Sequence, residues 1–248
     1  MEKIALITGA TDGMGLATAK TLGKEGYTVI INGIDDEQAA KATKELDSLN
    51  IKNEYYHFDV TNEDEIVAAF AKIHAKYDHL DVLVNNAGGL GGRQTFEEMT
   101  TKFFTFVMSL NFYSALWITR ECIPMLKKGT NASVINFASN AAYNGGGPGA
   151  GIYGASKAAV LTATRAMCKE LSPSIRVNAV SPGTIDTHFH DGIKSTKPEV
   201  FASWANNIQL KRLGKAEEVA NVVKFLVSDD ASFIDGEVIQ VGGGQDFL

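Results

Sequence analysis

Short apolar runs alternate with helical patterns along the whole chain, and this alternation constrains the fold more than any other feature of the sequence. Strands that are separated by helices form a parallel sheet, and its buried strands read as continuous apolar runs. The runs Ile4–Ile7 and Val29–Ile31 have this character. We therefore predict an α/β fold, a doubly wound parallel sheet of about seven strands with helices on both faces.

No linker, repeat or break in composition divides the 248 residues, so we expect residues 1–248 to form a single domain with a sizeable core. The expected strands span residues 4–8, 27–31, 54–59, 82–84, 133–137, 176–180 and 237–241. One expected helix ends near residue 23, and the others span residues 36–49, 64–77, 100–128, 153–171 and 217–227.

Charge and composition exclude several classes of function. The net charge of −6 disfavours binding to nucleic acid or to an anionic membrane. Lys3 runs directly into an apolar run of strand length, and no run is long enough to span a bilayer. The two cysteines, Cys122 and Cys168, lack metal-ligand spacing. Two buried, reduced thiols fit a cytoplasmic protein.

A glycine-rich turn joins the first strand to the first helix. It reads Thr8-Gly-Ala-Thr-Asp-Gly-Met-Gly15, with the spacing GxxxGxG. Residues without a Cβ atom allow a tight turn and a close approach to a pyrophosphate, and the following helix offers free N–H groups at the positive end of its dipole. Because the turn lies at the first strand-to-helix junction, it predicts a dinucleotide site.

The residues after the second strand favour NAD(H) over NADP(H). They read Asn32-Gly-Ile-Asp-Asp36, without the arginine that would bind a 2′-phosphate, and Asp12 adds a further negative charge. The two aspartates also suit the start of a helix, so this preference remains open. Asp59 closes the third strand, where its carboxylate either reaches the adenine amino group or caps the next helix, a role that Thr61 shares.

Four polar side chains form a candidate catalytic group. Tyr153 and Lys157 are four residues apart, which places both on one helix face. Ser139 ends a buried strand fourteen residues before Tyr153 and can point into the same crevice. Asn111 lies inside an expected helix, where asparagine is unfavourable without a specific role.

With these residues in place, the sequence resembles the short-chain dehydrogenase/reductase family, in its branch of about 250 residues. The resemblance covers almost the whole chain and implies a single-domain Rossmann fold. The matching residues, in family order, are Thr8-Gly9, Gly13, Gly15, Asn85-Asn86-Ala87-Gly88, Asn111, Ser139, Tyr153, Lys157, Pro182-Gly183 and Thr187.

The resemblance implies an NAD(P)-dependent oxidoreductase that transfers a hydride between nicotinamide and a carbonyl or secondary alcohol. In such an enzyme Tyr153 is the acid/base, and Lys157 lowers the pKa of Tyr153 and holds the nicotinamide ribose. Ser139 bonds the substrate oxygen, and Asn111 holds a water that links Lys157 to solvent.

The resemblance also implies a set of cofactor-binding residues. Asn86 and Gly88 should flank the adenosine ribose, Gly183 should let the backbone pass the nicotinamide ring, and Ile185 and Thr187 should meet its carboxamide. The full expected set is Gly9, Thr11, Asp12, Gly13, Met14, Gly15, Ile34, Asp59, Val60, Asn86, Ala87, Gly88, Tyr153, Lys157, Pro182, Gly183, Ile185 and Thr187.

The sequence departs from the family pattern in three regions. Gly33 and Ile34 stand where arginine or aspartate is frequent, so the choice of cofactor is open. Asp12 replaces a frequent basic residue, which argues against NADP. Gly242 replaces a common aspartate, which puts a C-terminal structural contact in doubt.

The substrate should be a small polar molecule such as a sugar, polyol, or keto or hydroxy acid. The expected pocket carries polar side chains, and Arg93 could pair a carboxylate. The candidate substrate residues are Arg93, Asn140, Tyr143, Asn144 and His188. Residues 186–210 should form a mobile lid, an irregular insertion over the site. His188 and His190 are too isolated to predict a metal site, so none is expected.

Two alternative functions remain. One is an NADPH-dependent 3-oxoacyl-(acyl-carrier-protein) reductase, which would need a basic docking surface near the pocket mouth. The candidates for that surface are Arg120, Lys127, Lys128, Arg165 and Lys169. The other is a non-catalytic dinucleotide-sensing module, which should have lost Tyr153 or Lys157, and both are present. The resemblance also implies that the long helices, which carry apolar residues such as Phe103 and Trp117, pair copies of the chain into a homo-oligomer, a dimer or tetramer. Burial within the monomer is the alternative explanation of these apolar residues.

Overall fold

The computed structural model describes residues 2–245 and contains one seven-stranded sheet in the order β3-β2-β1-β4-β5-β6-β7. Every neighbouring pair of strands is parallel, which confirms the predicted doubly wound sheet. The strands are β1 (Lys3–Ile7), β2 (Tyr27–Gly33), β3 (Asn53–His57), β4 (Val82–Asn85), β5 (Ser133–Phe137), β6 (Arg176–Pro182) and β7 (Val238–Val241).

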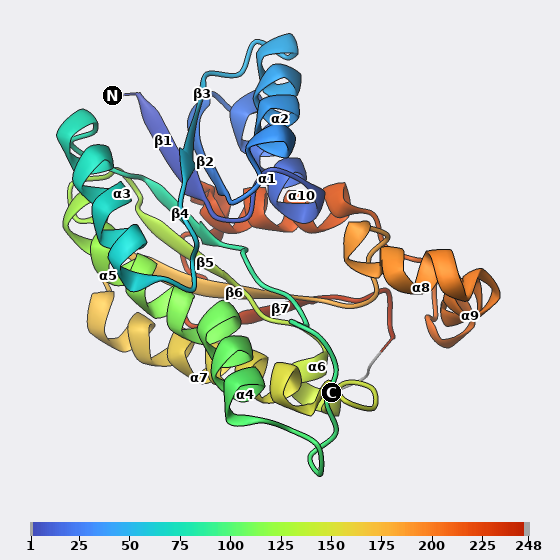
Figure 1. Cartoon of the computed structure of the whole chain (residues 1–248). Coiled ribbons are helices and arrows are strands. Elements are labelled where there is room, and N and C mark those ends of the chain that lie inside the picture. Colours follow the sequence, from blue (N-terminus) through green and yellow to red (C-terminus); the bar gives the residue numbers. More distant parts are fainter. Residues whose placement is uncertain (1, 246–248) are drawn as a thin grey trace.

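Helices cover both faces of the sheet (Figure 1). Successive strand side chains point to opposite faces, so Ala5 and Ile7 belong to one core while Ile4 and Leu6 belong to the other. The first core lies under α1 (Gly13–Lys24), α2 (Asp36–Ser48) and α10 (Ala216–Val227). The second lies under α3 (Glu63–Lys76) and α5 (Ser114–Leu126), and α4 (Thr101–Met108) and α7 (Gly151–Leu171) continue that layer.

The order of the strands determines where a ligand binds. β1 lies between β2 and β4, so the chain leaves β1 in one direction along the sheet and later returns on its other side. Open α/β sheets bind ligands at the carboxyl ends of the strands beside such a switch point. The glycine-rich turn follows β1 directly. Other predicted site residues follow later strands at the same edge, namely Asp59 after β3, Asn86 after β4, Ser139 after β5 and Gly183 after β6.

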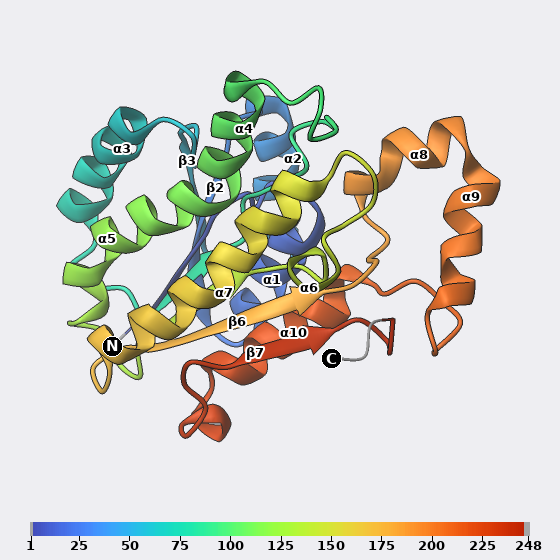
Figure 2. The same cartoon turned by 90° about the horizontal axis from the view of Figure 1, so that it is seen from below.

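Two predicted segments were wrong in detail. The expected helix 100–128 is divided by a π-helical turn, η1 (Ser109–Tyr113), between α4 and α5. The expected irregular insertion 186–210 is largely helical, because its apolar side chains pack on one another. It comprises η2 (His188–His190), α8 (Asp191–Thr196), α9 (Pro198–Ser203) and η3 (Trp204–Asn207). Figures 1 and 2 show α8 and α9 projecting beyond the carboxyl edge of the sheet.

Smaller differences concern the remaining elements. Two short helical segments, α6 (Ala141–Asn144) and η4 (Asp229–Ala231), were not predicted. Cys122 is buried, whereas Cys168 is partly exposed rather than buried, and both thiols are free. Within residues 2–245, no helix combines the length and apolar character needed to cross a membrane.

Candidate active site

The turn after β1 forms an open cradle at the start of α1. Gly9 and Gly13 have φ angles of +58° and +53°, which other residues rarely adopt. A Cβ atom on Gly15 would lie 2.2 Å from the Gly9 carbonyl oxygen, so only glycine fits there. The side chain of Asp12 does not cap the helix, and the first turn contains no acidic residue. The turn therefore presents the N–H groups of a helix start, as a pyrophosphate site requires.

Asn86 stabilises this cradle from the end of β4. Its Nδ2 atom donates hydrogen bonds to the carbonyl oxygens of Thr8 at 2.8 Å and Gly9 at 2.9 Å. In return, the Thr8 hydroxyl accepts hydrogen bonds from the backbone N–H groups of Asn86 and Ala87. Asn86 was expected to flank a ribose, but its side-chain amide is engaged in holding the glycine turn.

Gln38 connects the glycine turn to the end of β2. Its Nε2 atom donates to Asp12 at 3.0 Å, and its Oε1 atom accepts from the Thr11 hydroxyl at 3.1 Å. Asp35 caps α2 by accepting from the Gln38 backbone N–H. A Cβ atom on Gly33 would lie 2.6 Å from Thr11, so the two loops are closely packed. These contacts hold the Asp12 carboxylate beside the end of β2, while the side chain of Ile34 is 65% exposed.

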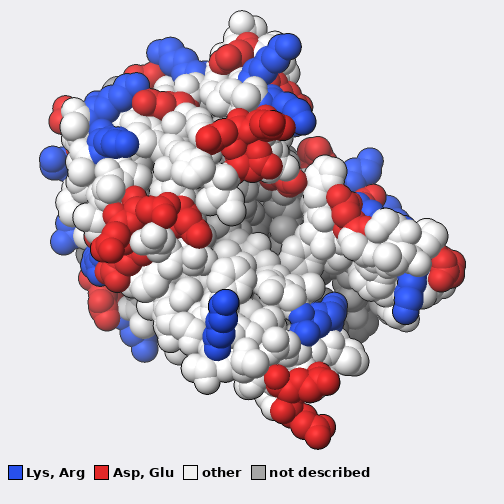
Figure 3. Space-filling view, viewed as in Figure 1, with Lys and Arg blue, Asp and Glu red and all other residues white. Residues whose placement is uncertain are grey.

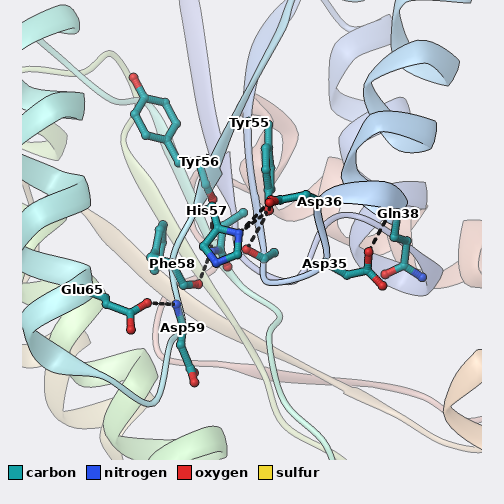
Figure 4. A network of polar contacts seen from close by, with 11 residues as sticks. Asp35, Asp36, Gln38, Tyr55, Tyr56, His57, Phe58, Asp59 and Glu65 are labelled. Carbon is teal, nitrogen blue, oxygen red and sulfur yellow. Dashed lines mark hydrogen bonds and ion pairs between the residues drawn. The ribbon is translucent and has the colours of Figure 1, made fainter.

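A second polar network joins the ends of β2 and β3 (Figure 4). His57 Nδ1 lies 2.8 Å from Asp36 Oδ1, and the Tyr55 hydroxyl donates to the same oxygen at 2.9 Å. These two contacts lower the pKa of Asp36, with His57 contributing most. Asp36 is therefore an anion held at this edge of the sheet.

Asp59 does not cap α3, because Asn62 occupies the N-cap position. The Oδ1 atom of Asp59 instead accepts from the backbone N–H and hydroxyl of Thr61, both at 2.8 Å. Its backbone N–H donates to Glu65. The neighbouring Val60 is buried. The structure thus assigns Asp59 to the turn that precedes α3, and adenine recognition by this carboxylate stays a prediction.

Three of the four catalytic candidates, Ser139, Tyr153 and Lys157, converge beyond the end of β5. Ser139 and Tyr153 share a hydrogen bond, although they come from the β5 loop and from α7. Lys157 is buried, and its Nζ atom donates to the Phe137 carbonyl oxygen at 2.7 Å. The same atom lies 5.9 Å from the centre of the Tyr153 ring. Burial lowers the pKa of Lys157 to about 8.

The pKa of Tyr153 is shifted in the direction opposite to the one expected. Burial of the ring raises it, and the hydrogen bond from Ser139, which favours the phenolate, only partly opposes this effect. The expected lowering by Lys157 does not occur in the protein alone, because burial acts on both groups and disfavours both charges. Tyr153 is therefore a protonated phenol, ready to donate.

Asn111 lies in the π-helical turn that interrupts the long helix. Its Nδ2 atom donates to the carbonyl oxygens of Val107 at 2.9 Å and Gly89 at 2.8 Å, and its Oδ1 atom accepts from the Gly89 N–H at 2.9 Å. A Cβ atom on Gly88 would lie 2.7 Å from Asn111 Oδ1 and 3.0 Å from Lys157 Nζ. The buried Asn111 therefore holds the loop after β4 directly against Lys157, which explains an asparagine at this helical position.

A cavity of about 700 Å³ opens above Ser139 and Tyr153, within the usual size range of ligand sites. Of the predicted substrate residues, Arg93, Asn140 and Asn144 line it. His188 and Tyr143 do not: His188 is exposed and pairs with Asp191, and Tyr143 is 37% exposed. The cavity also contains lid residues that the sequence reasoning did not select, namely Phe189, His190, Ile193, Trp204 and Asn207.

The two lid histidines differ because η2 directs them to different surroundings. His190 contacts the rings of Phe189, Phe201 and Trp204, whereas His188 faces Asp191. Among the residues that the structure describes, no group of three or more His, Cys, Asp or Glu side chains is arranged to hold a metal ion.

The loop after β6 completes the cavity. A Cβ atom on Gly183 would lie 2.8 Å from the Gly242 Cα atom, so the packing of the two loops alone already requires glycine here. The C-terminal contact that Gly242 put in doubt is supplied by Gln245, whose Oε1 atom accepts from the backbone N–H and hydroxyl of Thr184. Thr187 faces Gly13 across the cleft, and a Cβ atom on Gly13 would lie 3.8 Å from it.

These features fit a nicotinamide dinucleotide. The cradle of Gly9, Gly13 and Gly15 suits the pyrophosphate, and Met14 of the same turn lines the cavity that Tyr153 also lines. Binding of the nicotinamide ribose by the buried Lys157 stays a prediction.

Comparison with known proteins agrees with this geometry. Residues 9–246 match the profile of a family described as enoyl-(acyl carrier protein) reductase. A 3-oxoacyl-[acyl-carrier-protein] reductase from Thermotoga maritima is 38% identical over 98% of this chain and 97% of its own length. A cyclopentanol dehydrogenase from Comamonas sp. is 35% identical over 98% of this chain and 96% of its own length.

Among solved structures, a short-chain dehydrogenase/reductase titled glucose/ribitol dehydrogenase from Brucella melitensis superposes with a TM-score of 0.91. It is 32% identical, and the match covers all of this chain and 98% of the other. These named enzymes support catalysis rather than a sensing module without catalysis. The chain therefore belongs to the short-chain dehydrogenase/reductase family, as an NAD(P)-dependent oxidoreductase that acts on CH–OH and C=O groups.

Proposed function

We propose that this enzyme interconverts a ketone and a secondary alcohol on a small polar substrate, with NAD(H) as its preferred cofactor. The observation that carries the proposal is the hydrogen-bonded pair of Ser139 and Tyr153 at the base of a cavity, with buried Lys157 beneath them. The amide groups of Asn140 and Asn144 on the cavity wall support a polar substrate. The Brucella melitensis structure, titled glucose/ribitol dehydrogenase, supports it as well.

Tyr153 is the proposed acid/base. In carbonyl reduction the bound nicotinamide supplies the hydride, and the phenol of Tyr153 gives its proton to the carbonyl oxygen. Ser139 donates a hydrogen bond to the same oxygen and stabilises its developing charge. Lys157, whose pKa burial lowers to about 8, is suited to return a proton toward Tyr153. Asn111 is proposed to hold a water that links Lys157 to solvent.

The electrostatics at the ends of β2 and β3 support NAD(H) over NADP(H). Figure 3 shows acidic side chains gathered over the α2 and α3 end of this face. The residues concerned include Asp36 and Glu37 in the first turn of α2, and Glu63, Asp64 and Glu65 in the first turn of α3. Asp12 and Asp36 are held in place by Gln38 and His57. Fixed carboxylates at this site would repel a 2′-phosphate.

A second candidate, reduction of 3-oxoacyl groups on acyl carrier protein, is favoured by the Thermotoga maritima relative. The basic residues considered for docking argue against it. Lys127 and Lys128 follow the end of α5, which precedes β5, and therefore lie at the opposite edge of the sheet from the cavity. Lys169 is sixteen residues beyond Tyr153 on α7, about 24 Å along the helix. Arg120 is engaged by Glu63 and Glu121.

We also propose a homo-oligomer in the cytoplasm. Exposed aromatic side chains on α4, at the α10 surface and before β7 support self-association, with Phe104 at 39%, Phe225 at 42% and Phe233 at 103% exposure. The free thiols Cys122 and Cys168 suit a reducing compartment. We propose in addition that residues 186–210, which contain α8 and α9, close over the bound substrate.

A substrate and cofactor panel tests the proposal. The purified enzyme is assayed with NADH and NADPH against sugars, oxo acids, cyclic ketones and a 3-oxoacyl thioester. We expect turnover of small polar carbonyl compounds with NADH preferred. Turnover of the thioester or of hydrophobic ketones alone would contradict the proposed substrate class, and a preference for NADPH would contradict the proposed cofactor.

A further inference from the structure

The wall of the substrate cavity is free of negative charge in a protein that is acidic overall. The chain carries 29 Asp and Glu residues against 23 Lys and Arg. Of the described residues that line the cavity, none is Asp or Glu, and Arg93 provides a full positive charge. The two carboxylates nearby on the lid are already paired, Asp186 with Lys194 and Asp191 with His188. This distribution favours an anionic ligand.

A backbone oxygen holds the Arg93 side chain in place, but no carboxylate among the described residues neutralises its charge. Its Nη1 atom donates to the Pro148 carbonyl oxygen at 2.8 Å, which holds the guanidinium at the cavity mouth. The adjacent backbone is tied down as well, because the Gln94 N–H donates to the Gly149 carbonyl oxygen at 3.1 Å. Within residues 2–245, no carboxylate lies within ion-pair distance of Arg93, whereas Arg120 and Arg212 both have acidic partners. The remaining N–H groups of Arg93 can form a two-point contact with a carboxylate.

His190 lies on the lid side of this wall, and its ring nitrogens lack a protein partner in the described part of the chain. The other four histidines, at positions 57, 74, 79 and 188, each contact an oxygen. Aromatic rings pack around His190, with centres 4.9 Å away in Phe189 and 5.3 Å away in Trp204. Burial, followed by the positive charge of Lys194, lowers the pKa of His190, so the ring is a neutral hydrogen-bond donor. His190 is partly buried and lines the cavity, so its ring can donate a hydrogen bond to a ligand there.

The aromatic cluster also relates this group to the catalytic centre. The Phe189 ring lies 6.2 Å from the Tyr153 ring on one side and 4.9 Å from His190 on the other. The recognition group is therefore separated from the acid/base by one intervening ring. A substrate that reaches both carries its reacting carbonyl and its recognised group several bonds apart, rather than on adjacent carbons.

We propose that Arg93 and His190 bind a carboxylate on the substrate, so that the enzyme acts on an oxo acid, or the corresponding hydroxy acid, with its carbonyl distant from the carboxylate. This inference rests on the proposed function, of which it specifies the substrate class. Arg93 supplies the charge and His190 supplies a directed hydrogen bond, while Ser139 and Tyr153 bind the carbonyl oxygen at the other end of the cavity.

Matched pairs of substrates test the inference. A series of unbranched oxo acids from 3-oxobutanoate to 6-oxoheptanoate is compared with the corresponding methyl esters, which keep the shape but lose the charge. We expect kcat/KM for the longer acids to exceed that for their esters at least tenfold, since one charge-assisted contact contributes about this much. Arg93→Gln should raise KM for the acids about tenfold and leave kcat/KM for the esters within about threefold.

Two variants separate recognition from packing. His190→Phe keeps an aromatic ring and removes the hydrogen-bond donor, so it should lower kcat/KM for the acids and not for the esters. His190→Gln, which keeps a donor, should restore part of that loss. Lys72 is an exposed residue on α3, and Lys72→Gln removes an equal charge. It should leave kcat/KM unchanged for both the acids and the esters. Equal losses on acids and esters in His190→Phe would assign His190 to packing and overturn its recognition role.

The outcomes also separate this inference from the proposed function. If the wild-type enzyme reduces the esters or neutral sugars as well as the acids, the carboxylate site is refuted while the proposed carbonyl chemistry stands. If the enzyme reduces a 3-oxoacyl thioester and none of the small substrates, both are refuted.

Discussion

Ser139 and Tyr153 share a hydrogen bond across the join between the β5 loop and α7, with Lys157 one helical turn further along α7. Ser139 and Lys157 are each held by a further contact: the Ala141 N–H donates to the Ser139 hydroxyl, and Lys157 donates to the Phe137 carbonyl oxygen. The pair is therefore positioned before any ligand arrives, which is the arrangement that an acid/base and an oxyanion donor require.

Replacing Tyr153 with phenylalanine should remove the proton donor and keep the ring. We expect kcat to fall by about 10²- to 10⁴-fold, the usual contribution of general acid catalysis, while the affinity for NADH changes less than about threefold. Steady-state kinetics and titration of NADH fluorescence measure the two effects. Tyr77→Phe, in which the lost hydroxyl contacts Glu54 far from the site, is the matched control. Undiminished turnover in Tyr153→Phe would refute the assignment.

The buried charge of Lys157 should lower the free energy of unfolding of the protein. Its folded pKa of about 8 lies below the ordinary value of 10.5, so the buried charge is unfavourable wherever both folded and unfolded states are protonated, which is below pH 8. Lys157→Met should thus be inactive but more stable at pH 7, by about 3 kcal/mol.

The difference in stability between the wild type and Lys157→Met should shrink as the pH rises. Between pH 8 and 10.5 the unfolded chain binds more protons than the folded protein, so the stability of the wild type rises relative to Lys157→Met. Urea unfolding of both proteins at pH 7 and pH 9.5 measures the change. A gap that stays constant between the two pH values would show that Lys157 does not titrate in this window.

Ile34→Arg should shift the cofactor preference toward NADPH. Ile34 is 65% exposed at the end of β2, where an arginine could bind a 2′-phosphate despite the nearby carboxylates. One such contact predicts an increase of about tenfold in the ratio of kcat/KM for NADPH to that for NADH. Leu49→Arg introduces the same charge at a residue that is 40% exposed after the other end of α2, and it should leave the ratio unchanged.

Asn86→Ala should destabilise the protein even without cofactor. The side chain donates two hydrogen bonds to the glycine turn, and their loss leaves the Thr8 and Gly9 carbonyl oxygens without these donors. We expect a loss of about 1–2 kcal/mol in unfolding free energy and weaker NADH binding. Asn221→Ala, at an exposed position on α10, is the control. A normal melting temperature combined with weak binding would instead indicate that Asn86 acts on the ribose alone.

Much of the fold could be predicted from local patterns. The seven strands were placed to within one or two residues, because buried parallel strands must be continuous apolar runs and the helices between them have a different period. The glycine turn was predictable, since φ angles of +58° and +53° need glycine. The four-residue spacing of Tyr153 and Lys157 needed only the geometry of a helix.

The details that depend on distant contacts could not be predicted. His188 and His190 are equivalent as sequence, and only the packing of Phe201 and Trp204 directs His190 into the cavity while Asp191 holds His188 outside. The π-helical turn contains Asn111, which binds Gly89, a residue twenty-two positions earlier in the chain.

The sequence alone thus determined the sheet, the dinucleotide cradle and the acid/base pair, since each follows from interactions between residues near in the chain. Only the tertiary structure decided that Gln38 and His57 hold Asp12 and Asp36 at the end of the sheet, and that the cavity wall combines Arg93 with a neutral His190. These features arise where segments distant in the chain meet, and burial and charge at such places depend on every neighbour at once.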